Sequence, residues 1–103
     1  MASHSHEPRR LLKQSFSGRG TTADLGDSND DLSNVKFFIV IAEPYKTYAK
    51  VSVVVPADLV GTDGYTESLQ AIGDVVNETQ QYISFSLSKS NKKIKINNQT
   101  SSA

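Results

Sequence analysis

Residues that could catalyse a reaction or bind a metal are few in this sequence and do not cluster. Both histidines belong to one motif, His4-Ser5-His6, and the 103-residue chain contains no cysteine. A His-x-His pair can bind a metal ion, but a stable site needs more ligands held on a fixed backbone. The motif lies in a stretch poor in apolar residues. We therefore predict no metal centre and no cofactor.

The acidic and glycine-bearing region in the middle of the chain has no recognisable catalytic pattern. The segment GTDGYTES, residues 61–68, lacks the Lys-Ser/Thr ending with which a phosphate-binding loop holds phosphate and magnesium. There is no Gly-x-Ser-x-Gly nucleophile motif. The acids of this region are Asp58, Asp63, Glu67 and Asp74. Nothing in the sequence fixes any two of them at a catalytic separation. We predict that the protein is not an enzyme.

The stretch QYISFSLSKSNKKIKI, residues 81–96, indicates binding rather than catalysis. Its apolar residues alternate first with serines and then with lysines, which is typical of strands with one polar face. Hydroxyl and ammonium groups attract phosphate, and an aromatic ring can stack on an unpaired base. We predict a polyanion-binding face without carboxylates. Simple solvation of this face, or contact with a protein partner, are the alternatives. The predicted residues are Lys36, Lys50, Ser52, Tyr82, Ser84, Ser86, Lys93 and Lys95, with Arg9 and Arg10 of the N-terminal segment.

Four apolar segments predict the strands of a small antiparallel sheet. Residues 35–43 and 48–56 are rich in β-branched and aromatic residues, and the short connection through Pro44 predicts a hairpin. Residues 35–43 are apolar on both faces, which is typical of a central strand buried on two sides. Residues 82–88 and 93–96 predict the other two strands.

The segment TESLQAIGDVVNETQQ, residues 66–81, is the helix candidate of the folded part. Thr66 can cap its N-terminus, and the apolar residues from Leu69 to Val76 follow helical spacing. Gly73 lowers its helical propensity. We therefore predict an α+β fold, in which a small antiparallel sheet of order β-β-α-β-β has one helix packed on one face. The opposite face is then the Ser/Lys face.

Composition divides the chain into three segments. Residues 1–33 hold few large apolar side chains and are basic first and acidic later, so we predict a flexible, disordered arm. Residues 34–97 are the predicted β-rich domain, and residues 98–103 a disordered tail. A domain of this size without disulfides is marginally stable alone. We therefore expect self-association to a homodimer or a larger assembly.

Two segments resemble the central hairpin and a later strand of coat proteins from small single-stranded RNA bacteriophages. They are FFIVIAEPYKTYAKVSVVVP, residues 37–56, and QQYISFSLS, residues 80–88, and together cover about 30 residues. The resemblance implies a dimer with a continuous sheet, an exposed face that binds an RNA hairpin, and assembly into shells. This sequence shows no counterpart of that family's two C-terminal helices. The RNA-facing positions under this resemblance are Lys50, Ser52, Ser84 and Ser86.

Two classes of function are consistent with these patterns. One is a small self-associating protein that binds RNA or another polyanion through the Ser/Lys face and the basic arm, as a viral structural protein does. The other is a protein-interaction module, such as an adaptor, inhibitor or effector. It would bind its partner through a sheet edge or through the arm, where RRLLKQSF, residues 9–16, is a candidate docking peptide.

The sequence carries no sign of a membrane segment. No apolar run approaches the roughly 18 residues of a membrane helix, and the N-terminus lacks the apolar core of a signal peptide. We expect an intracellular location, in the cytoplasm or in a virion, although a mature secreted chain would have the same pattern. The glycosylation motifs at Asn77 and Asn98 have meaning only in a secretory route.

Overall fold

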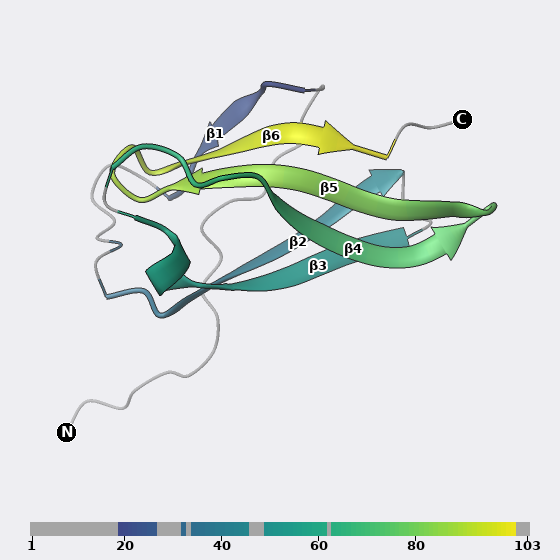
Figure 1. Cartoon of the computed structure of the whole chain (residues 1–103), viewed down its shortest axis with the longest axis horizontal. Helices are drawn as coiled ribbons and strands as arrows, with labels where there is room; N and C mark the ends of the chain where they lie inside the picture. The colour runs from purple at the N-terminus through teal and green to yellow at the C-terminus, as the bar shows by residue number, and fades with distance from the viewer. Residues whose placement is uncertain (1–18, 27–31, 33, 46–48, 62, 101–103) are drawn as a thin grey trace.

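The computed structural model describes residues 19–26, 32, 34–45, 49–61 and 63–100. These residues form a six-stranded sheet in which every neighbouring pair is antiparallel, in the order β1-β6-β5-β4-β3-β2 (Figure 1). The short 3-10 helix η1, Ala57–Leu59, follows β3. The strands are β1 Thr22–Asp24, β2 Phe37–Tyr45, β3 Ala49–Pro56, β4 Leu69–Val76, β5 Thr79–Ser88 and β6 Lys93–Gln99.

The predicted α+β fold is wrong, because the described part of the chain is all-β. Residues 66–81, predicted as a helix, contain β4, a two-residue turn and the start of β5. In that turn Asn77 and Glu78 have positive φ angles of 50° and 63°. Two positive φ angles are typical of the type I′ turn, whose twist matches that of the strands it joins. The apolar spacing fitted both a helix and a bulged strand, and pairing with β5 stabilises the strand.

The sheet curls into a half-barrel with its core on the concave side. Strands β2 and β3 lie close to β5, although neither is its neighbour in the sheet order (Figure 1). The β3–β4 ladder is short, with the pairs Val51↔Gly73 and Ser52↔Ile72, so the sheet can bend there. Val51 and Phe85, on opposite sides of this bend, are both 0% exposed. The concave side thus provides the buried apolar surface that a flat sheet would lack.

Part of the predicted flexible arm belongs to the sheet. Residues Thr22–Asp24 form β1, which pairs with β6, and Leu25 and Leu32 are buried in the core. A strand this short depends on its partner strand, so local composition does not reveal it. At the other end, β6 extends into the predicted tail, and the Thr100 N–H donates to the carbonyl oxygen of Tyr82. Residues 1–18 and 101–103 lie outside the described residues.

Candidate functional site

Most of the predicted polyanion residues are split between two regions on the outer, convex side of the sheet. Lys50 and Ser52 lie on β3 and are exposed, because they alternate with the buried Val51. Lys36 precedes β2 and is also exposed. The remaining described members lie on β5 and β6, and β4 separates these strands from β3. Arg9 and Arg10 lie outside the described residues. The structure therefore does not gather these residues into one site.

The predicted exposure of Ser84 and Ser86 is wrong. They are only 7% and 4% exposed, respectively. The side-chain amide of Asn97 donates to Ser86 Oγ at 2.9 Å and to Ser68 Oγ at 3.1 Å. Ser68 belongs to the segment that leads into β4, where Thr66 N–H also donates to the backbone of Leu87. This segment, distant in sequence from Ser86, covers part of the outer side of β5.

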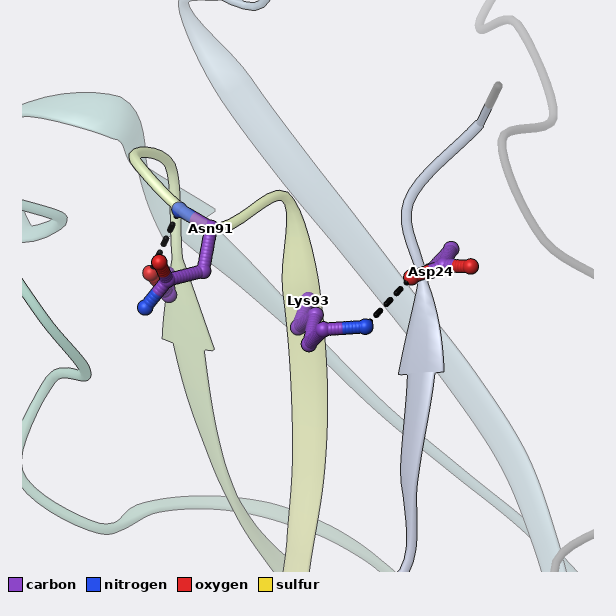
Figure 2. A network of polar contacts seen from close by, with 4 residues as sticks. Asp24, Asn91 and Lys93 are labelled. Carbon is purple, nitrogen blue, oxygen red and sulfur yellow. Dashed lines mark hydrogen bonds and ion pairs between the residues drawn. The ribbon is translucent and has the colours of Figure 1, made fainter. Parts of the chain in front are cut away.

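The lysines of β6 interact with nearby side chains. Lys93 Nζ lies 2.6 Å from Asp24 Oδ1, and the two side chains point toward one another from β6 and β1 (Figure 2). The hydrogen bond and the charge of Asp24 raise the pKa of Lys93 above its ordinary value. Lys95 Nζ lies 4.8 Å from the centroid of the Tyr65 ring, a cation–π distance. The prediction that this face has no carboxylate is wrong, because β1 contributes Asp24.

The rest of this region is a hydrogen-bonded part of the fold. Tyr82 is partly buried, and its hydroxyl accepts a hydrogen bond from the Asn98 amide at 3.1 Å. In the turn after β5, the Asn91 N–H donates to Ser88 Oγ at 3.1 Å. These side chains already have partners within the chain. Hydrogen bonds within the fold thus hold the polar side chains of the β5–β6 surface.

The outer side of the sheet carries exposed apolar residues that the predicted site did not include. Six large apolar side chains on β2, β3 and β4 are between 50% and 64% exposed; Val75 lies beyond the register shift in β4, and the other five lie together. They are neighbours across the strands: Ile39 pairs with Val54, and Ile41 pairs with Ser52, which pairs with Ile72. We call this set the outer apolar patch. It consists of Phe37, Ile39, Ile41, Val54 and Ile72.

Three members of the outer apolar patch lie on β2, which is an edge strand. Among the described residues, β2 is the last strand in the sheet order and pairs with β3 alone. The prediction of a central strand buried on both sides is therefore wrong, although its apolar residues do lie on both faces. Pro44, near the end of β2, has no N–H to donate, as is common in edge strands. The signal in the sequence was the run FFIVI, which leaves no polar face for water.

Comparisons with known proteins do not place this chain in a family. Scans against models of protein families, curated proteins and solved structures found no match. The resemblance to phage coat proteins stays a prediction drawn from strand pattern.

Across the described ranges of the chain, no three or more His, Cys, Asp or Glu side chains group into a metal site. His4 and His6 lie outside these ranges. The same ranges contain no helix that is long and apolar enough to cross a membrane. The prediction of a protein without metal or enzymatic activity stays a prediction.

Proposed function

We propose that this protein is a non-enzymatic, self-associating protein whose contact surface is the outer apolar patch with the adjoining open edge of β2. The observation that carries the proposal is the exposed row of Phe37, Ile39 and Ile41 along an edge strand. Water-facing strand positions in an antiparallel sheet are normally polar. A flat apolar edge strand is a surface to which another strand readily adds.

The proposal joins two of the predictions made from sequence. Self-association was expected because the folded part is small, and binding through a sheet edge was expected of an interaction module. RNA binding through the Ser/Lys face gains no support from the geometry, since Ser84 and Ser86 are buried and Lys93 is ion-paired. Because the patch is only a few residues wide, we expect an affinity in roughly the micromolar range.

The proposal is tested by placing charges in the patch. The double variant Ile39→Lys/Ile41→Lys puts two ammonium groups on the outer side of β2, where their charge is solvated in a monomer and costly in a contact. Light scattering should report a wild-type mass that rises from monomer toward dimer as the concentration passes through the micromolar range. The double variant should keep the monomer mass over the same range.

Leu59→Lys provides the matched control. Leu59 is 62% exposed, as large and apolar as the patch residues, but it lies on η1 outside the patch. This variant should associate like the wild type. A wild-type protein that stays monomeric at high micromolar concentration would refute the proposed function. Equal loss of association in the Leu59 variant would show that the patch is not the contact surface.

A further inference from the structure

We propose that the partner is a second copy of this chain, paired edge to edge through β2 in an antiparallel register that places Ile39 opposite Ile39 of the second copy. This inference rests on the proposed self-association and adds its geometry. The paired strands would join the two sheets into one, with Phe37, Ile39 and Ile41 of each copy beside the same residues of the other.

Edge pairing fits the outer apolar patch better than face-to-face packing. The patch is narrow: Lys50 on β3 and Gln70 on β4 are exposed polar neighbours. Packing two outer faces together would remove these polar groups from water without giving them partners. The outer side is also convex, which limits the contact between two such faces. Edge pairing leaves Lys50 and Gln70 in water and brings together the apolar row on β2.

The other edge of the sheet explains why association would end at two copies. β1 is three residues long, Thr22–Asp24, and its Asp24 carboxylate is bound to Lys93. Short, charged edge strands resist the addition of further strands. A contact of β2 with β2 uses the same surface on both copies, so it closes on itself. A filament would need a second sheet edge that can pair with a strand of another copy.

Side-chain alternation restricts the register of this pairing. Outer residues must face outer residues, because a slip of one position would move every side chain to the other face. Centring the pair on Ile39 places Phe37 of each copy opposite Ile41 of the other. The three exposed β2 residues then all have apolar partners. On the inner side, the same register places Phe38 opposite Val40.

The two neighbouring registers that keep this alternation are less favourable. Centring on Val40 would place Phe37 opposite the carboxylate of Glu43. Centring on Phe38 would place Lys36 opposite Val40. Either register also breaks the pairing of the three exposed residues with one another, because Phe37 would face Glu43 in the first and Ile41 would face Val35, before the start of β2, in the second. In the proposed register the charged residues face only Ala42 and Val35, at the ends of the pair.

The proposed register also suits the ends of β2. Lys36 faces Ala42 of the second copy and Glu43 faces Val35, so the charged residues lie at the two ends of the pair, on opposite faces of the joined sheet. The side chains of Lys36 and Glu43 are exposed and can stay in water at these ends. Pro44, which cannot donate a ladder hydrogen bond, faces Asn34, which lies before the start of β2. The missing donor therefore costs the ladder no hydrogen bond.

Cysteine cross-linking tests the register directly, because the chain has no cysteine of its own. In an antiparallel pair, directly opposite Cα atoms are roughly 4.5–5.5 Å apart, which allows a disulfide. Sheets packed face to face are about 10 Å apart, too far for one. Under mild oxidation, Ile39→Cys should therefore form disulfide-linked dimers at least about tenfold faster than Val54→Cys. The latter has a similar exposure, 56% against 50%, but lies one strand inward.

A mixing experiment completes the test. Phe37→Cys and Ile41→Cys should cross-link when mixed and not when oxidised separately. Rapid self-cross-linking of the Ile41 variant, or faster cross-linking of the Val54 variant than of the Ile39 variant, would overturn the proposed pairing. If the wild type associates but the Ile39→Cys variant does not cross-link, the proposed pairing is also overturned, although self-association stands. A monomeric wild type by light scattering would instead refute the proposed function itself.

Discussion

Gly73 determines how closely β3 and β4 approach one another. A Cβ atom at this position would collide with the carbonyl oxygen of Lys50 and would lie 3.1 Å from Cγ1 of Val51. The Gly73 carbonyl also accepts a hydrogen bond from the side-chain amide of Gln80. Glycine in a strand often marks such a close backbone approach. The residue that weakened the helix prediction is thus needed where the sheet bends.

We expect Gly73→Ala to lower the free energy of unfolding by about 1–3 kcal/mol, because the backbone oxygen that the new methyl group meets cannot move without disturbing the ladder. Gly61→Ala is the control, since a Cβ there meets nothing within 4 Å. Urea unfolding followed by circular dichroism measures both. Equal midpoints for the two variants would show that β3 and β4 are not this close in solution.

The β4–β5 hairpin is the element that sequence reasoning misassigned. Residues 66–81 were predicted as a helix because four apolar residues follow helical spacing, and Asn-Glu is a weaker turn signal than Asn-Gly. The β2–β3 hairpin, predicted from its β-branched and aromatic residues and its short connection, is confirmed, and so are the strands β5 and β6, predicted from their regular alternation. The burial of Ser86 could not be predicted, since Ser68 and Asn97 contact it from distant parts of the chain.

The turn of this hairpin yields a prediction of its own. A left-handed conformation costs an ordinary L-residue roughly 1–2 kcal/mol, and Glu78 adopts it with φ 63°. Glycine removes this strain but loses more chain entropy on folding. Glu78→Gly should therefore raise the free energy of unfolding by about 0.5–1 kcal/mol. Glu67→Gly, at an exposed position without positive φ, should lower it. Destabilisation of similar size in both variants would argue against the type I′ turn.

At the scale of the whole molecule, the core and the outer apolar patch belong to the same strands. β2 places Phe38 in the core while its neighbours Phe37 and Ile39 remain exposed. A strand that is apolar on both faces is suited to a protein in which one face folds the monomer and the other contacts a partner. The described chain is small and has no disulfide. Association through β2 would therefore also stabilise the fold.

This coupling predicts that the melting temperature depends on protein concentration. A partner that binds the folded chain alone shifts stability by mass action, and a hundredfold change in its concentration corresponds to about 2.7 kcal/mol. Because a dimer contains two chains, about half of this free energy stabilises each chain. A hundredfold increase in protein concentration should therefore raise the melting temperature of the wild type by at least about 5 °C for a domain of this size. Calorimetry at two concentrations measures it. The Ile39→Lys/Ile41→Lys variant should melt at one temperature at both concentrations, whereas Leu59→Lys should follow the wild type. If the wild type also melts at a single temperature, folding and association are independent, and the exposed row on β2 has no part in stabilising the fold.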